Sequence, residues 1–312
     1  MLSSAFALGR VIEPARCVAT GWGGHNRMWR LQTSSGAWAI KEVRRDLPPS
    51  IERSFGIECE AVARGVPAPE PRSSTDGNVY AHVDGAVVRC HSWVDGHAKT
   101  NETVTVDDAA AMGRIVAVLH GLRIVVPAMP SGPSRRSFGE AHWVELAERG
   151  AYAGAVWAER VRANIAAIMT VEGMLDRLPP PRDLIGSHCD LNAHNVLFGQ
   201  ELMLIDWDGA DAADPGFERA SYAALWGSST TGRPDSARTT AFLSGYLDGG
   251  GTLDAEDIDT LGGWMRGVLS WTEHNLQLAL RGIGDNQHSA ANGLVGALIN
   301  APRTIECRRA HL

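Results

Sequence analysis

The first part of the chain alternates apolar and polar positions with a period of two residues. Residues 28–33 show this alternation, a turn follows at Ser34-Ser35-Gly36, and residues 37–41 continue it. Such a period is typical of strands, so the pattern predicts a hairpin. The other elements expected here are a helix over residues 51–64 and a second hairpin over residues 79–83 and 86–93.

Beyond residue 96 the apolar residues recur at helical spacing. Thr105, followed by Asp107 and Asp108, is typical of a helix start. The expected elements are helices over residues 105–122, 155–178 and 254–280, with a short β-rich insert over residues 185–206. The change of pattern predicts an α+β chain of two lobes. Residues 1–95 would form a small β-rich N-lobe and residues 96–312 a larger, mainly helical C-lobe, with a ligand cleft between them.

Composition narrows the classes of protein that the chain can represent. It has 312 residues, 44% of them hydrophobic, and a formal net charge of −7, which argues against disorder and against a general nucleic-acid binder. Five cysteines without a CxxC pair argue against a disulfide framework or a structural zinc site, and favour a reducing compartment. No apolar run is long enough to cross a membrane. We therefore expect a cytoplasmic protein without nucleic-acid or membrane partners.

Lysine is rare in this chain. Of 29 basic residues, only Lys41 and Lys99 are lysine. Lys41 lies at the end of the first predicted hairpin. Its ammonium is a compact point charge, unlike the planar, forked guanidinium of arginine. Lys99 matches no motif and is interpreted as a surface residue.

The segment most informative about chemistry runs from Ser187 to Asp208. The apolar runs 196–198 and 202–205 flank a turn, and antiparallel pairing is expected to place Phe198 opposite Met203 and Asn195 opposite Asp206. Asp190 lies in the loop just before. Amide and carboxylate oxygens gathered in this way suit Mg²⁺. The alternatives are an ordinary polar hairpin, a metal site of His188, Asp190 and His194, and a reactive Cys189.

This segment resembles the aminoglycoside phosphotransferase and choline-kinase-like family of small-molecule kinases. The resemblance is carried by His-x-Asp-x-x-x-x-Asn and a following apolar strand that ends in Ile-Asp-x-Asp. It implies a bilobal protein-kinase-like fold that uses ATP and Mg²⁺. It also implies Asp190 as the catalytic base, Asn195 and Asp206 as Mg²⁺ ligands, and His188 as a structural residue of the loop.

The same resemblance assigns roles nearer the N-terminus. Lys41 would pair with the phosphates of ATP, and a helix carboxylate would hold this lysine. Glu52, Glu58 and Glu60 are the candidates, and Glu58 is the choice because of its spacing from the following Gly-Val-Pro. Positions that match the nucleotide loop are Gly23 and Gly24, and those that match the adenine-binding hinge are Ser92, Trp93 and Val94.

Residues for an acceptor are expected after the metal-binding Asp and on the distal helix. The candidates are Asp208, Trp271, Glu273 and Asn275. Acidic and aromatic side chains suit a hydroxylated, possibly cationic amine. The alternative is that the tryptophans belong to the core and that Asp214-Pro215 starts a helix.

The expected function is ATP-dependent transfer of the γ-phosphate to a hydroxyl of a small molecule, such as an aminoglycoside, an amino sugar or a related amine. The motifs leave open which acceptor is used and whether the reaction inactivates an antibiotic or belongs to metabolism. They also leave open whether ATP or GTP is the phosphate donor. The alternatives are a non-catalytic nucleotide- or ligand-binding protein on a kinase scaffold, and a protein kinase. The missing His-Arg-Asp, Asp-Phe-Gly and Ala-Pro-Glu sequences argue against the protein kinase.

Overall fold

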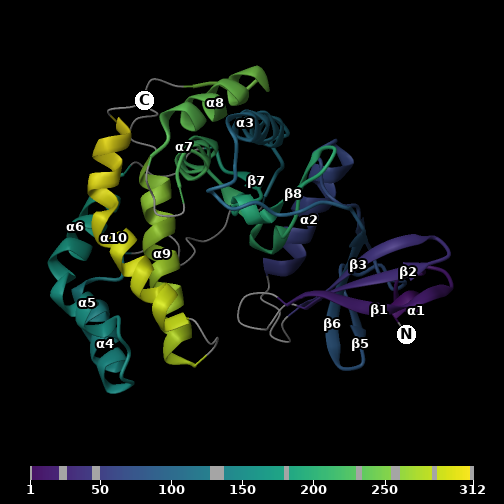
Figure 1. Ribbon diagram of the computed structural model, residues 1–312, viewed down its shortest axis with the longest axis horizontal. Helices are drawn as coiled ribbons and strands as arrows, with labels where there is room; N and C mark the ends of the chain where they lie inside the picture. Colours follow the sequence, from purple (N-terminus) through teal and green to yellow (C-terminus); the bar gives the residue numbers. More distant parts are fainter. Residues whose placement is uncertain are drawn as a thin grey trace. The chain divides into compact units, whose positions relative to one another are not determined.

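A computed structural model describes residues 2–20, 27–43, 50–126, 137–178, 183–229, 234–253, 261–282 and 287–309. The chain divides into two compact units, which we call the sheet unit and the helical unit. The sheet unit comprises Met1–Thr103, Val118–Val126 and Ile185–Ala212, and the helical unit comprises Val104–Ala117, Pro127–Leu184 and Ala213–Leu312. The combination of an antiparallel sheet with many helices confirms the α+β class (Figure 1).

The sheet unit is built around antiparallel strands in the order β1-β2-β3-β6-β4, with β5 paired to β6. The two expected hairpins are present as β2–β3 and β5–β6. Its elements in this part are α1 (Leu2–Ala5), β1 (Val11–Thr20), β2 (Arg27–Thr33), β3 (Gly36–Val43), α2 (Ser50–Ala63), β4 (Pro71–Arg72), β5 (Ala81–Val83) and β6 (Ala86–Ser92).

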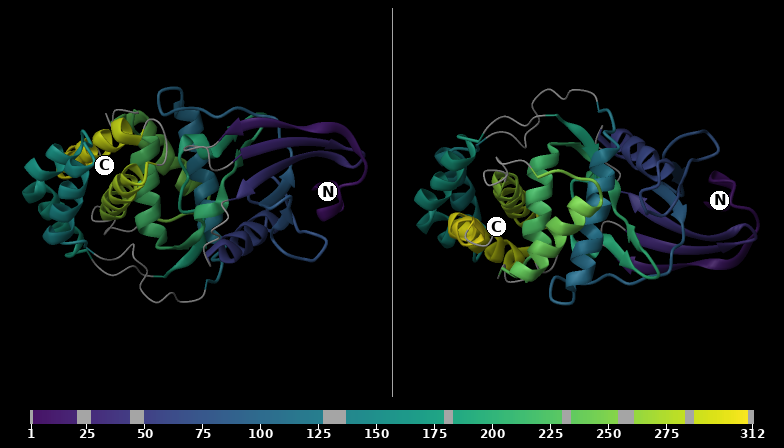
Figure 2. Two further views of the ribbon diagram at one scale, coloured as in Figure 1. Left: turned by 90° about the horizontal axis from the view of Figure 1, so that it is seen from below. Right: turned by 90° about the horizontal axis from the view of Figure 1, so that it is seen from above.

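The two faces of this sheet have different neighbours. Ile40, Val88 and Cys90 share one face with the buried side chains of Phe6 and Leu8, which follow α1. The opposite face packs on helix α2 through Val43, Ile51 and Val87, and Figure 2 shows this helix, in indigo, along one side of the strands. Because side chains alternate between the faces of a strand, Lys41 and Arg89 lie on the α2 face.

The remainder of the sheet unit carries the segment with the predicted chemistry. Its elements are β7 (Ile185–Ser187), the short 3₁₀ turns η3 (Ala193–Asn195) and η4 (Trp207–Gly209), β8 (Val196–Phe198), β9 (Leu202–Leu204) and β10 (Asp211–Ala213), whose last residue belongs to the helical unit. The predicted β8–β9 hairpin is present, but its predicted register is wrong by one residue. Phe198 pairs with Leu202, and the N–H of Ile205 donates to the carbonyl of Asn195. The shift arises because only three residues form the turn.

The helical unit contains a core to which most of its helices contribute. Its helices are α3 (Val106–Gly121, whose last turn belongs to the sheet unit), α4 (Glu140–Tyr152), α5 (Ala158–Ala163), α6 (Ile165–Leu175), α7 (Pro215–Trp226), α8 (Ser236–Asp248), α9 (Leu261–Leu280) and α10 (Gln287–Arg309). Figure 1 shows α10, in yellow, beside α9. The core includes Trp143, Trp157, Ile168, Leu276 and Leu298, and α4, α5, α6, α7, α9 and α10 contribute to it, but the described residues of α3 and α8 do not. Among the described residues, no helix is long and apolar enough to cross a membrane.

Helix boundaries confirm some expectations and correct others. The Thr105 start of α3 is confirmed, because Thr105 and Asp108 exchange hydrogen bonds as a capping box. The helix expected over residues 155–178 is instead two helices that break at Asn164, whose side chain donates to the carbonyl of Arg160. Residues 254–260 of the third expected helix lie outside the described residues, whereas the predicted 51–64 helix is present as α2 (Ser50–Ala63).

Candidate active site

The loop after β7 is tied to the end of β9 by His188. This histidine is fully buried, and its Nε2 donates to the carbonyl of Ile205 at 3.0 Å. Its ring also lies 4.5 Å from the ring of Trp207, centroid to centroid. Because Ile205 directly precedes Asp206, these contacts bring Asp206 close to the loop that carries Asp190. His188 therefore has the structural position that the sequence predicted.

The carboxylate of Asp190 is held by two amides. Asn192 Nδ2 donates to Oδ1 at 2.8 Å, and Asn195 Nδ2 donates to Oδ2 at 2.8 Å and to the carbonyl of Asp190 at 2.9 Å. The residue is exposed, yet the protein around its carboxylate desolvates it and raises its pKa to about 6, with a further contribution from the negative charge of Asp206. The two amide donors oppose this rise. Asp190 therefore combines a fixed orientation with a raised pKa, as in a general base.

Lys41 is bound by two carboxylates that follow β9. Its Nζ donates to Oδ1 of Asp206 at 2.5 Å and to Oδ2 of Asp208 at 2.7 Å. Asp206 has a left-handed backbone, with φ 66°, which directs the chain into the η4 turn that carries Asp208. Burial would lower the pKa of Lys41, but the charges of Asp208 and Asp206 outweigh it and raise the pKa above its ordinary value. The ammonium is therefore fully charged.

The partner of Lys41 differs from the prediction. Glu58 on α2 does not contact Lys41. Its two carboxylate oxygens accept hydrogen bonds from Arg89 and, at 3.0 Å, from His91. Arg89 stands directly opposite Lys41 in the β3–β6 register, so its side chain takes the carboxylate that the prediction gave to the lysine. Burial would raise the pKa of Glu58, but His91 and Arg89 hold it below its ordinary value.

Two oxygen atoms of this site fit a divalent cation. Asn195 donates through Nδ2, which leaves Oδ1 as an acceptor, and Asp206 binds Lys41 through Oδ1 alone in the hydrogen bonds described above. Hard oxygen donors of this kind suit Mg²⁺, which often uses one or two carboxylates and completes its shell with phosphate oxygens and water. Within the described ranges, no group of three His, Cys, Asp or Glu side chains could hold a metal ion, so the predicted alternative of His188, Asp190 and His194 lacks support.

The predicted nucleotide residues are only partly described. Gly23 and Gly24 lie outside the described residues. Two of the predicted hinge donors already have partners, since the backbone N–H of Ser92 donates to Glu70 and that of Trp93 to Ala37, both at 2.9 Å. Those two N–H groups are therefore engaged within the sheet unit, and adenine contacts of Ser92 and Trp93 through other backbone atoms stay a prediction. Val94 follows β6 and stays a predicted contact.

The predicted acceptor residues are divided between the two units and have different contacts. Asp208 lies in the sheet unit, and its carboxylate binds Lys41 and Arg89. Asn275 is buried in α9 and donates to the backbone carbonyl of Trp271. Glu273 accepts from His142 at 3.1 Å and from Gln277 at 3.1 Å. Trp271 is 57% exposed and stacks on His274, which leaves it as the accessible member of the set.

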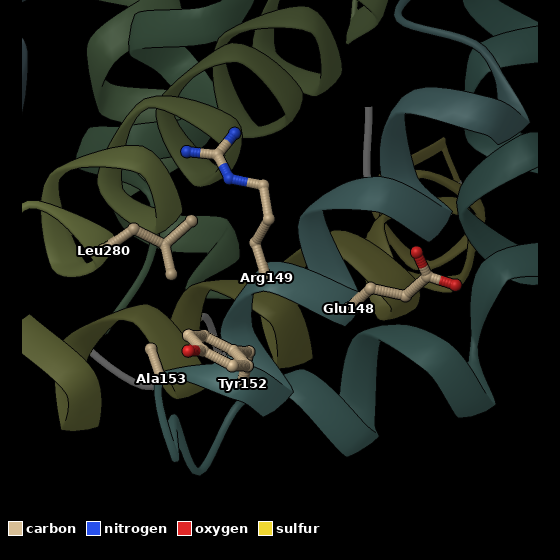
Figure 3. A pocket seen from close by; sticks show the side chains of 5 residues that line it. All are labelled: Glu148, Arg149, Tyr152, Ala153 and Leu280. Atoms are coloured by element: carbon tan, nitrogen blue, oxygen red, sulfur yellow. The ribbon is translucent and has the colours of Figure 1, made fainter.

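A separate hollow opens between α4 and α9 in the helical unit. It has a volume of about 440 Å³ and is lined by Glu148, Arg149, Tyr152, Ala153 and Leu280. Figure 3 shows Arg149 and Leu280 turned toward each other, with Glu148 pointing away. None of the predicted site residues lines this hollow, so it is not the predicted site.

Sequence reasoning missed two residues of the site. Asn192 orients Asp190, and Arg89 connects Glu58 with Asp208. A signal for Arg89 was present in the sequence, because this charged residue interrupts the apolar run Val87-Val88-Arg89-Cys90. In a strand with two buried faces, such a charge needs a buried partner. Asn192 carries no comparable signal, since asparagine is common in polar turns.

Comparisons with known proteins bear on the fold and on the family of this chain. Among curated proteins, none matches the sequence. Several solved structures resemble the whole chain. Spectinomycin phosphotransferase, in complex with ADP and spectinomycin, has a TM-score of 0.70 at 14% identity, covering 100% of this chain and 97% of its own. Amicoumacin kinase, bound to AMP-PNP and Ca²⁺, has a TM-score of 0.66 at 13% identity, covering 96% and 91%. The ethanolamine kinase of Plasmodium vivax has a TM-score of 0.61 at 13% identity, covering 91% and 81%.

These similarities confirm the fold that the sequence predicted, although identities this low establish the fold alone. The sequence itself provides the stronger assignment. The profile of the phosphotransferase enzyme family matches residues 17–253, a range that includes Lys41, Asp190, Asn195 and Asp206. This range covers well over half of the chain, and the protein belongs to the phosphotransferase enzyme family.

Proposed function

We propose that the protein transfers the γ-phosphoryl group of ATP to a hydroxyl group of a small molecule. The observation that carries this proposal is the gathering of Lys41, Asp190, Asn195 and Asp206 within one compact unit. Their chemistry supplies a phosphate-binding cation, a base and two oxygen donors for a divalent cation. Phosphoryl transfer depends mainly on positioning and on electrostatic stabilisation, and this set provides both.

In this proposal Asp190 orients the acceptor hydroxyl and takes up its proton as the new O–P bond forms. The two amide donors fix the direction of the carboxylate, which an effective base needs. Lys41 binds phosphate oxygens through its ammonium and so holds ATP for in-line transfer. Asn195 and Asp206 would hold Mg²⁺, which neutralises charge on the phosphate oxygens when it is bound.

The proposed acceptor is a hydroxylated amine, such as an amino alcohol or an amino sugar. Two observations support this class. One similar structure is that of an ethanolamine kinase, and ethanolamine is an amino alcohol. The helical unit also presents the exposed indole of Trp271, and aromatic faces of this kind attract cations.

A coupled assay for ADP release tests the function. The panel contains aminoglycosides, other amino sugars, choline-like alcohols and peptide antibiotics, each with Mg²⁺ and ATP. We expect ADP release that depends on one acceptor class. Asp190→Asn should lower this turnover by about 10² to 10⁴-fold while the affinity for Mg²⁺–AMP-PNP stays close to that of the wild type.

The control for this variant is Asp248→Asn, which changes an exposed carboxylate on α8. It should keep wild-type turnover. Wild-type turnover in Asp190→Asn would remove Asp190 from the reaction, and the absence of ADP release with every acceptor would contradict the proposed function.

A further inference from the structure

Arg89 is a fully buried arginine at the centre of the site, with 1% of its surface exposed. Its guanidinium donates to Glu58 through one nitrogen and to Oδ1 of Asp208, at 2.8 Å, through another. It also lies over the ring of Phe55, 5.2 Å from the centroid. A buried charge is costly unless its partners are well placed, so this geometry fixes both carboxylates as well as the arginine. Phe55 and Glu58 both belong to α2, which therefore forms one wall of the arginine site.

Arg89 and Lys41 are direct neighbours across two strands. They form a cross-strand pair of β3 and β6 and project on the same face of the sheet. Like charges in such positions repel each other. Asp208 relieves this repulsion, because its Oδ1 accepts from Arg89 and its Oδ2 accepts from Lys41 at 2.7 Å. Burial would raise the pKa of Asp208, but these two cations hold it below its ordinary value. The carboxylate is thus fixed at both ends.

The position of the Lys41 ammonium therefore depends on Arg89. Lys41 contacts Asp206 and Asp208 but not Glu58, so the connection from α2 to the lysine passes through Arg89 and Asp208. Arg89 is too deeply buried to bind a ligand itself. A planar guanidinium with several donors can bind two carboxylates at once, whereas a lysine ammonium in its place would be a shorter point charge.

We infer that Arg89 is a positioning residue for phosphoryl transfer, which fixes Asp208 and through it holds Lys41 in place for the phosphates. This inference rests on the proposed function. Lys41 is thus held through Arg89 and Asp208 instead of by a direct contact with a carboxylate of α2.

A double-mutant cycle in the full-length protein tests the inference. The variants are Arg89→Lys, Asp208→Asn and the combination of both. The readouts are the affinity for Mg²⁺–AMP-PNP by calorimetry, the KM for ATP and kcat in the ADP-release assay, and Tm. Each single variant should weaken nucleotide affinity by about tenfold to a hundredfold, which corresponds to the loss of a hydrogen bond to a charged group. The combination should be no weaker than the worse single variant, because both changes remove the same contact.

The matched control is Arg219→Lys. Arg219 is also buried, at 4% exposure, and lies 5.5 Å from the ring centroid of Tyr246, but it belongs to the helical unit. This control should lower Tm and leave nucleotide affinity unchanged. If Arg89→Lys does not fold, the nucleotide affinity of Asp208→Asn alone tests the inference, because the inference requires that this variant bind Mg²⁺–AMP-PNP more weakly than the wild type.

Three results overturn the inference while the wild type binds and turns over ATP. They are additive losses in the cycle, wild-type nucleotide affinity in Asp208→Asn, and an equal loss of affinity in Arg219→Lys. A wild-type protein that neither binds Mg²⁺–AMP-PNP nor releases ADP contradicts the proposed function itself, and the inference then falls with it.

Discussion

Asn192 donates from its Nδ2 to Oδ1 of Asp190 at 2.8 Å, while its own Oδ1 accepts from the backbone N–H of His194 at 3.2 Å. One side chain thus orients the proposed base and caps the 3₁₀ turn that carries Asn195. These two tasks need different atoms of the same amide. Substitutions that remove one atom or both can therefore separate them.

We predict that Asn192→Asp lowers kcat by about tenfold to a hundredfold, because a carboxylate keeps the cap but repels Asp190 instead of donating to it. Its Tm should stay close to that of the wild type. Asn192→Ala should lower kcat and also cost about 1 kcal/mol of stability, since the cap is lost as well. Steady-state kinetics and thermal denaturation measure both effects. Wild-type kcat in Asn192→Asp would show that the donation to Asp190 has no role in turnover.

The sequence predicted those parts of the site that depend on neighbouring residues along the chain. The order of Asp190, Asn195 and Asp206 along a loop and hairpin placed all three in one cluster, as the structure does. The cross-strand neighbour of Lys41 depended instead on which strand lies next to β3. That strand is β6, which is distant in sequence, so the charge of Arg89 within an apolar run was visible in the sequence but its place beside Lys41 was not.

Helix prediction from apolar spacing was incomplete, since α4, α8 and α10 were not predicted, and α10 shows one reason. The buried positions of α10 include Ala291, Val295, Leu298 and Ala301, of which two are alanine. Alanine is common on both faces of a helix, so the buried face of α10 differs little in hydrophobicity from its exposed face. Similarly, α5 and α6 were predicted as one helix, because the break at Asn164 depends on a side-chain contact with the backbone that the apolar pattern does not record.

The pairing of Glu58 predicts an acid-dependent loss of stability. Its pKa lies below the ordinary value of 4.5, because His91 and Arg89 outweigh the effect of burial. A carboxylate whose pKa is lowered by folding stabilises the fold at pH values above its unfolded pKa, and this stabilisation is lost as the pH falls through the folded pKa. The Tm of the wild type should therefore exceed that of Glu58→Gln at neutral pH, and the two should converge in acid.

Thermal denaturation followed by circular dichroism, from about pH 7 to about pH 3, measures this difference. The exposed Glu60 on the same helix, which pairs with Arg64 just beyond the helix end, provides the control. Glu60→Gln should give a curve close to that of the wild type. A difference between Glu58→Gln and the wild type that stays constant across this pH range would contradict the prediction.

Glu172 on α6 is predicted to stabilise the helical unit. It is fully buried, and its carboxylate accepts from the backbone N–H groups of Phe138 and Gly139, at 3.0 and 2.9 Å, and from Nε1 of Trp143 at 2.8 Å. Glu172→Ala would leave three donors without an acceptor, so we expect a loss of about 3 kcal/mol. Denaturant unfolding, followed by near-UV circular dichroism of the tryptophans, measures it. Glu159→Ala, at an exposed carboxylate on α5, should cost less than about 1 kcal/mol, and equal losses would contradict the prediction.

Trp271 on α9 is predicted to contact the acceptor. Its indole is 57% exposed and stacks on His274 at 5.8 Å between ring centroids, so its removal should change the fold little. Once the acceptor is known, Trp271→Ala should raise the acceptor KM by about tenfold, through loss of stacking or cation–π contact, and leave the KM for ATP and Tm unchanged. The control is Tyr152→Ala on α4, which removes an aromatic ring that is 98% exposed and lines the separate hollow in Figure 3. A raised acceptor KM in both variants, or in neither, would show that the exposed face of Trp271 does not bind the acceptor.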